Sequence, residues 1–245
     1  MEQRKCWVQK IAILLCMIIT LSSASPVVEV QAAQYSTNGP ITGVASLNKY
    51  SLLLRVGKSG QLICQGTTGT MKWVSSKPSV ATVDQNGLVK AKKAGEAIIT
   101  VSGGNMIGSM QCRVGVSKKI SQKAAKAKIL SMKSKYKEGM SWTNEKNYYL
   151  WEAINCRCYG CIALVGEVSD KVFGKYAPVT THKNFDKIKI GDHVRIGDAH
   201  SVIVIGKSMT AITVLEGNYN ASIHWNRKIT KTELKKEGFY VDSRY

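Results

Sequence analysis

The sequence predicts two folded domains, an all-β sandwich followed by an α+β domain. Residues 41–117 contain short alternating apolar runs broken by Gly, Asn and Pro, which is typical of a sandwich of short strands. Residues 160–174 carry apolar side chains at spacings of three and four, which predicts an amphipathic helix. Strand candidates follow this helix, and one helix packed on an antiparallel sheet gives an α+β domain. These candidates are residues 188–196, 200–206, 210–216 and 223–229.

The N-terminal segment has the composition of a secretory signal peptide. Three basic residues among the first ten precede the mostly apolar run 11–21, and small residues lead to Ala32-Ala33. This order predicts export, with cleavage after Ala32 or Ala33. The apolar run is too short to span a bilayer, and no second long run follows it. We expect a signal peptide over 1–32 and a mature protein without a transmembrane segment, secreted and either extracellular or cell-wall associated.

The chain is strongly basic. Its 245 residues include 35 Lys and Arg against 16 Asp and Glu, a formal net charge of +19. Such a field attracts polyanions at long range. An exported protein meets an anionic cell wall or membrane surface rather than nucleic acid, so the expected partner is peptidoglycan or another anionic cell-wall polymer. A lysine-rich surface that serves only solubility is the alternative.

Four short motifs mark the first domain. They are Trp73-Val-Ser-Ser76, Val80-Ala-Thr-Val-Asp84, Asn86-Gly-Leu-Val89 and Ala94-Gly-Glu-Ala-Ile-Ile-Thr100. Together they resemble the bacterial immunoglobulin-like group-two domain, and the match covers most of 41–117. The resemblance implies an immunoglobulin-like β-sandwich that acts as a stalk or adhesion module, without catalysis of its own. Trp73 would then be its core tryptophan.

The segment between the two domains differs in composition from both. Residues 118–137 are rich in alanine and lysine, which favours a helix. The apolar side chains form only a narrow stripe, so the segment is expected to be a solvated linker helix that docks on the second domain. A helix lying on a membrane surface is the alternative, but the stripe lacks bulky aromatic residues.

The second domain contains a candidate nucleophile with a base in reach. Cys161 stands at the head of the predicted helix 160–174, where the positive end of the helix dipole favours a thiolate. His200 opens an apolar strand, and a hairpin that turns around 207–209 places it opposite Glu216, with Asn218 close by. Either Glu216 or Asn218 could accept a hydrogen bond from one imidazole nitrogen while the other nitrogen faces the thiol.

Several motifs of the second domain follow a known family pattern. They are Lys135-Tyr-Lys-Glu-Gly-Met-Ser-Trp142, the segment 161–174, Ile190-Gly-Asp-His-Val-Arg195, His200-Ser-Val-Ile-Val204, and Glu216-Gly-Asn-Tyr-Asn220 with Ile223-His-Trp225. They resemble the CHAP-like and NlpC-type cysteine peptidases and amidases, over about residues 120–245. The domain itself is expected to span 138–245.

That resemblance implies a papain-like fold and a thiol hydrolase of peptidoglycan amide or peptide bonds, with no cofactor or metal. Cys161 would be the nucleophile and His200 the base, with Glu216 and Asn218 completing the site. The sequence Ile-Ala-Leu-Val after Cys161 departs from the family, which usually carries Phe there, so altered packing is expected. A catalytically inactive cell-wall-binding or adhesion protein is the alternative from another functional class.

Five cysteines remain after signal cleavage, so at least one thiol is unpaired. Cys64 and Cys112 share the inward side of their strands, and either form a disulfide or remain two buried thiols. A disulfide from Cys156 or Cys158 to Cys161 would mask the nucleophile. A zinc site of these three cysteines with a histidine, and Cys158 as the nucleophile, are weaker alternatives.

Overall fold

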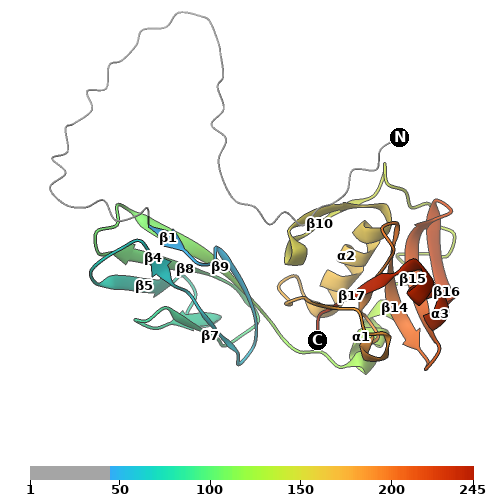
Figure 1. Cartoon of the computed structure of the whole chain (residues 1–245), viewed down its shortest axis with the longest axis horizontal. Coiled ribbons are helices and arrows are strands. Elements are labelled where there is room, and N and C mark those ends of the chain that lie inside the picture. Colours follow the sequence, from blue (N-terminus) through green and yellow to red (C-terminus); the bar gives the residue numbers. More distant parts are fainter. Residues whose placement is uncertain (1–44) are drawn as a thin grey trace, which may run out of the picture. The chain divides into compact units, whose positions relative to one another are not determined.

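The structure, a computed structural model, describes residues 45–245. The expected signal peptide lies outside these residues. Strands β1 to β9 occupy the first part of the described chain, and the helices and remaining strands follow from residue 122 (Figure 1). No helix within residues 45–245 is both long enough and apolar enough to cross a bilayer.

Residues 46–117 fold as a β-sandwich, as predicted. One sheet has the strand order β2-β9-β8-β5, the other has β3-β7-β6, and β1 pairs with β4. The strands are β1 (Ser46–Leu47), β2 (Ser51–Arg55), β3 (Ser59–Gln61), β4 (Cys64–Gln65), β5 (Met71–Ser75), β6 (Ala81–Val83), β7 (Leu88–Ala91), β8 (Gly95–Gly103) and β9 (Ser109–Ser117). In β8, Ala97, Ile99 and Val101 are buried at every second position, so alternate side chains form the core.

The turn between β6 and β7 depends on a glycine. Gly87 has a φ of 78°, in the left-handed region that glycine adopts without steric cost. A Cβ there would lie 2.4 Å from the carbonyl oxygen of Leu62 and 3.0 Å from the ring of Trp73. Trp73 itself is half-buried and packs against the sandwich core. The turn therefore closes directly over the tryptophan, and any side chain at this position would push the two apart.

The two sandwich cysteines are thiols. Cys64 is half-buried, Cys112 is buried, and neither forms a disulfide in the structure. Burial raises the pKa of Cys112 to about 11, with Lys49 acting weakly in the opposite direction. Cys112 is therefore a protonated, buried side chain at neutral pH.

The linker helix is shorter than predicted. Helix α1 spans Gln122–Leu130, within the expected range 118–137, and the Ser121 side chain caps it by accepting from the backbone N–H of Ala124. Ala125 and Ile129 of α1 are buried in the core of the second domain. The narrow apolar stripe is thus long enough to dock a helix of nine residues, and the chain turns away where the stripe ends.

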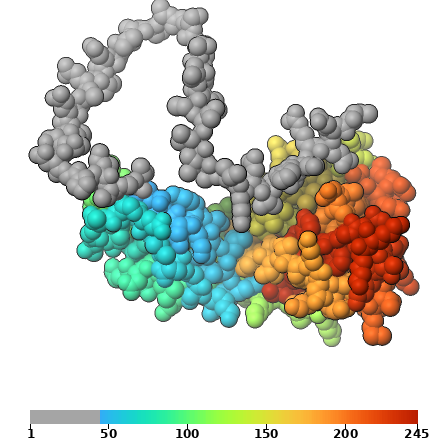
Figure 2. Space-filling model, viewed as in Figure 1, coloured from blue at the N-terminus to red at the C-terminus, as the bar shows by residue number. Residues whose placement is uncertain are grey.

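The second domain is built on a six-stranded antiparallel sheet with the order β12-β17-β13-β14-β15-β16. Its elements are β10 (Tyr148–Trp151), η1 (Glu152–Ile154), β11 (Cys156–Tyr159), α2 (Gly160–Phe173), β12 (Thr180–His182), η2 (Phe185–Lys187), β13 (His193–Ile196), β14 (His200–Lys207), β15 (Ala211–Tyr219), β16 (Ser222–Thr230), α3 (Lys231–Glu237) and β17 (Phe239–Ser243). In the space-filling view, the C-terminal strands and α3, coloured orange to red, form one continuous surface (Figure 2).

Helix α2 is the central helix of this domain. It ends before Gly174, which has a φ of 85°, as the sequence predicts. Leu164 and Val168 of α2 share a core cluster with Ile203 of β14 and Leu215 of β15. A separate cluster contains the alternate residues of these strands together with Leu234 of α3. The observed arrangement is therefore α+β, with apolar cores formed by both sets of alternating strand residues.

The sequence prediction lacks β10, β11, β12, α3 and β17, and its strand 188–196 begins five residues too early. Residues 188–192 turn instead, with Gly191 at a φ of 94°. Helix α3 opens with a reciprocal capping box between Thr230 and Glu233, a signal present in the sequence. Strand β17 pairs with both β12 and β13. Such distant pairing leaves no local sequence signal.

Replacing Gly87 by alanine is expected to destabilise the sandwich by about 2–4 kcal/mol, because left-handed strain of about 1–2 kcal/mol adds to a clash with Leu62. Gly57→Ala is the matched control, since Gly57 has a φ of 80° and open space around its Cβ position. The Gly57→Ala variant should lose only the stability that corresponds to the left-handed backbone strain. Hydrogen exchange of the amides in 46–117 reports the free energy of unfolding. Equal losses in the two variants would contradict the packing role of Gly87.

Candidate active site

Cys161 is the second residue of α2, and the residue before it is held from two sides. Gly160 has a φ of 53°, and a Cβ there would lie 2.0 Å from Oδ1 of Asn144 and 2.8 Å from Nδ2 of Asn218. The indole N–H of Trp142 donates to the carbonyl oxygen of Gly160 at 2.8 Å. Only glycine fits this position, and the contacts fix the direction in which the helix carries its thiol.

His200 lies at the start of β14, and the predicted hairpin register is wrong by two residues. The strands pair Val202, rather than His200, with Glu216. The turn lies later than expected, since Lys207 pairs with Ile212, and an irregularity between Val204 and Gly206 changes the register again before Glu216 is reached. Side chains alternate between the two faces of a sheet, so a register shift of two residues leaves His200 and Glu216 on the same face. Its Nε2 therefore still reaches Oε2 of Glu216, at 2.7 Å.

Glu216 is a fully buried carboxylate with two cationic partners. Its side chain is 0% exposed, and Arg227 of β16 approaches it with Nε 2.5 Å from Oε1 and Nη2 2.6 Å from Oε2. Burial raises the pKa of Glu216, but the hydrogen bonds from His200 and Arg227 outweigh it and hold the pKa below its ordinary value. Glu216 is thus an ionised acceptor that orients the imidazole.

The sequence analysis missed Arg227. Strands β15 and β16 pair Glu216 with His224, and their register shifts between Val214 and Leu215. Counting residues along a regular hairpin would therefore not bring Arg227 to the carboxylate. The only available signal was chemical, because a buried glutamate requires a cation.

The thiol and the imidazole are hydrogen-bonded partners that shift one another's pKa. Burial raises the pKa of Cys161, but the hydrogen bond and charge of His200, together with the backbone N–H of Ser201 and the charge of Arg195, bring it below its ordinary value. Burial lowers the pKa of His200, but Cys161 and Glu216 raise it to about 9. Since Nε2 is bound to Glu216, Nδ1 is the nitrogen left for the thiol. The pair favours thiolate and imidazolium at neutral pH.

Asn218 takes a different place from the one that the sequence predicts. Its Nδ2 donates to Oδ1 of Asn144 at 2.9 Å, beside Gly160, whereas the ring of His200 is held by Glu216. Of the four predicted residues, the structure joins three in a hydrogen-bonded chain and places Asn218 next to the start of α2. The Asn144 contact was not predicted, because it joins segments 74 residues apart.

An aromatic side chain that was not among the predicted site residues lies beside the imidazole. The ring of Tyr219 lies with its centroid 6.1 Å from that of His200. The guanidinium carbon of Arg227 lies 4.7 Å from the same tyrosine ring. The side chain of His200 is 19% exposed and Cys161 is 7% exposed, so only a narrow approach to the pair is open.

A second histidine network lies directly behind the candidate site. His193 of β13 contacts Asp242 through Nδ1 at 3.0 Å and the Ser201 hydroxyl through Nε2 at 3.1 Å. The chemical order is that of a Ser-His-Asp triad, but Ser201 is 0% exposed and has no access to a substrate. His193 lies within the predicted strand 188–196 and is a buried residue of β13 that anchors β14 next to His200.

The neighbouring cysteines do not mask the candidate nucleophile in this structure. Cys161 is a free thiol, and the Cys158 thiol donates to the carbonyl oxygen of Cys156 at 3.5 Å. Cys156 and Cys158 belong to the apolar core of the domain. Among residues 45–245, no three His, Cys, Asp or Glu side chains gather as they would around a metal ion, so the three-cysteine zinc site is not formed there.

Several solved structures are similar to parts of this chain, all at low identity. Structures similar to this chain include domains 4 and 5 of the S-layer protein SbsC (20% identity, TM-score 0.26, covering 32% of this chain and 53% of that one). A termite-gut GH10 xylanase that contains a bacterial Ig-like domain shares 24% identity (TM-score 0.24, covering 33% and 23%). An intimin mutant from EHEC O157:H7 shares 13% (TM-score 0.25, covering 79% and 86%). The chain thus spans about half of the first structure and a quarter or less of the second.

No curated protein sequence matches the chain. Residues 47–114 match the family model of the bacterial Ig-like domain, group 2. The matched segment covers the sandwich from β1 into β9 and includes all four sequence motifs of the first domain. Residues 47–114 are therefore a bacterial immunoglobulin-like domain of group 2.

Proposed function

We propose that residues 138–245 are a papain-like cysteine hydrolase domain of the CHAP or NlpC type, which cleaves amide or peptide bonds of peptidoglycan. The hydrogen-bonded chain Arg227–Glu216–His200–Cys161, ending at the first turn of a helix, carries this proposal. It supplies a nucleophile, a base and an orienting carboxylate in one connected unit. The bacterial Ig-like domain supports an exported protein that works at the cell surface.

In the proposed reaction the thiolate of Cys161 attacks the amide carbonyl carbon and forms a tetrahedral intermediate. The imidazolium of His200 gives its proton to the leaving amine, the C–N bond breaks, and a thioester remains. Neutral His200 then takes a proton from water, whose oxygen attacks the thioester. The acid is released, and the proton held by His200 restores the ion pair. Glu216 stays ionised and keeps the ring aligned throughout.

The start of α2 offers a site for the developing oxyanion. The first N–H groups of a helix have no partner within the helix, and they point toward its N-terminal end. The thiol of Cys161 lies in this first turn, so a carbonyl under attack would place its oxygen near these donors. The Asn144–Asn218 pair beside Gly160 limits where the substrate carbonyl can lie.

A surface-binding protein without catalysis is the second candidate function. The Ig-like domain favours it, because the module needs no enzyme to act as a stalk or adhesion unit. Under that hypothesis the ion pair of the second domain would be structural. The two candidates differ in one measurable property, which is turnover by Cys161.

Cys161→Ala is expected to abolish release of soluble fragments from purified peptidoglycan, with a rate loss of at least about 10³-fold because the nucleophile is removed. Mass spectrometry of the fragments identifies the bond that is cut. Cys158→Ala is the matched control, and it should retain the product pattern. The proposal fails if wild type and Cys161→Ala release the same fragments, or if wild type releases none.

The alkylation of Cys161 by iodoacetamide should persist well below pH 9, because His200 lowers the thiol pKa. Hydrolysis should decline as pH rises through about 9, where His200 loses the proton that the leaving amine needs. In His200→Ala the alkylation midpoint should move upward, since only the backbone N–H of Ser201 and the charge of Arg195 then oppose the effect of burial on the thiol pKa. Peptide mass spectrometry at each pH gives the extent of alkylation of each cysteine. Identical midpoints in wild type and His200→Ala would contradict the ion pair.

Glu216→Gln is expected to lower kcat by roughly 10²-fold or more, because a neutral amide orients the imidazolium less well and leaves Arg227 unpaired. The alkaline limb of the pH profile should also move to lower pH, as the carboxylate no longer raises the pKa of His200. Asn218→Ala should keep that limb in place. A Glu216→Gln enzyme with an unchanged pH profile would show that the carboxylate is only structural, and thermal unfolding of both variants separates lost folding from lost chemistry.

A further inference from the structure

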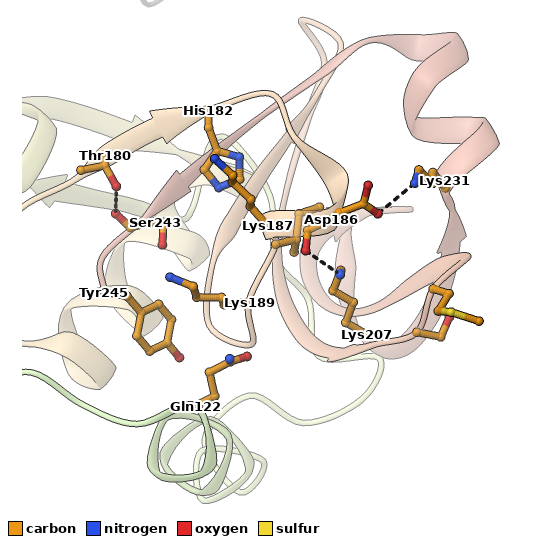
Figure 3. Close-up of a pocket in the computed structure, with 13 residues that line it drawn as sticks. Gln122, Thr180, His182, Asp186, Lys187, Lys189, Lys207, Lys231, Ser243 and Tyr245 are labelled. Atoms are coloured by element: carbon orange, nitrogen blue, oxygen red, sulfur yellow. Dashed lines mark hydrogen bonds and ion pairs between the residues drawn. The ribbon is translucent and has the colours of Figure 1, made fainter.

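A hollow of about 960 Å³ opens on the second domain (Figure 3). Elements far apart in the sequence line it, from α1, β12 and η2 to the end of β14 and the C-terminal strand. Cys161, His200 and Glu216 are not part of the lining. Four lysines do line the hollow, namely Lys187, Lys189, Lys207 and Lys231. The hollow is therefore a cationic site that the proposed chemistry does not use.

The positive charges of two of these lysines are partly balanced by Asp186. The Nζ of Lys231 lies 2.9 Å from Oδ1 of Asp186, and that of Lys207 donates to the Asp186 carbonyl oxygen at 3.1 Å. Asp186 is the single acidic side chain in the lining. Both ammonium groups also lie within 5.3 Å of the centroid of the Phe185 ring. On this wall of the hollow, Asp186 therefore holds both ammonium groups, one through its carboxylate and the other through its backbone carbonyl oxygen.

Among residues 45–245, no carboxylate lies within ion-pair distance of the ammonium groups of Lys187 and Lys189, although Asp192 acts on Lys189 from farther away. The Lys189 ammonium lies 5.0 Å from the centroid of the Tyr245 ring, and Lys187 lies beside His182 in Figure 3. Burial lowers the pKa of His182, and the charges of Lys187 and Lys189 lower it further against a smaller opposite effect of Asp242. The imidazole therefore registers a positive potential inside the hollow, where an anion would be attracted.

We propose that this hollow binds phosphodiester groups of an extended anionic polymer. Lysine ammonium groups bind phosphate oxygens as point charges, and several of them surround this one hollow. Its volume lies near the upper end of the range for drug-sized ligands, which exceeds the need of a single phosphate. The backbone of a repeating phosphodiester would place successive charges against the two lysine pairs.

Two other phosphodiester sources fit the lining less well. An anionic membrane needs apolar side chains to enter its surface, and Met209 is the one strongly exposed large apolar residue of the lining. Nucleic acid without base pairing needs aromatic platforms for its bases. Tyr245 is the only Phe, Tyr or Trp residue of the lining, and its ring packs edge-on against Phe173 at 5.0 Å between centroids. The polymer is therefore one that carries phosphodiesters without bases.

The test is binding of a poly(glycerol phosphate) oligomer to the full chain, measured by calorimetry at several salt concentrations. The double variant Lys187→Gln/Lys189→Gln should bind at least about tenfold more weakly, and its log–log salt slope should fall by about one for each lysine removed. The matched control is Lys137→Gln/Lys146→Gln, which removes the same charge from exposed positions of this domain outside the hollow. It should bind nearly as wild type. The variant Cys161→Ala should bind normally, because this inference does not depend on the thiol chemistry.

Equal weakening in both double variants would overturn the proposal, since it would mean that diffuse surface charge attracts the polymer. Unchanged binding in Lys187→Gln/Lys189→Gln would overturn it as well. So would tighter binding to phosphatidylglycerol vesicles or to a single-stranded DNA oligonucleotide than to poly(glycerol phosphate). NMR locates the contact independently, because the polymer should shift the ring resonances of His182 and leave those of His224 unchanged. The reverse pattern would place the polymer elsewhere and refute the site.

Discussion

The buried negative charge of Glu216 is the constraint on which the second domain depends. Removing a carboxylate from water costs several kcal/mol unless its oxygens are paired in good geometry. Arg227 pairs with both oxygens, and His200 takes a further bond to one of them. Three adjacent strands must therefore adopt one register for the charge to be tolerated. The interaction that holds β14, β15 and β16 together is the same one that points the imidazole at Cys161.

Strand β14 is also fixed on its other side. His200 and Ser201 are consecutive, so their side chains leave the strand in opposite directions. One joins the carboxylate and the thiol, while the other enters the buried network with His193 and Asp242. The backbone N–H of Ser201 meanwhile contributes a hydrogen bond to Cys161. A rigid strand keeps a base within reach of a nucleophile more closely than a loop could.

Local patterns in the sequence predicted the parts of this arrangement that local physics determines. The apolar period of α2, its closing glycine and the alternation of β14 and β15 identified Cys161, His200 and Glu216. The predicted hairpin register was wrong because the turn lies later and the pairing shifts between Val204 and Gly206, yet an error of two residues keeps His200 and Glu216 on the same face of the sheet. The role of Arg227 was not predicted because it depends on the irregular pairing of β15 and β16. The position of Asn218 was not predicted because it depends on a contact with the distant Asn144. The motifs of residues 73–100 predicted the first domain more fully, since turns and alternation define that fold.

The position of β17 has a consequence for how the domain assembles. Strands β14, β15 and β16 follow one another as hairpins, and such short closures cost little chain entropy. Strands β12 and β13 have no direct pairing with each other and meet only through β17, with Thr180 opposite Ser243, 63 residues away. The hairpin that carries His200 and Glu216 can therefore form first. The sheet closes late, when the distant strand arrives, and only then is the network behind His200 complete.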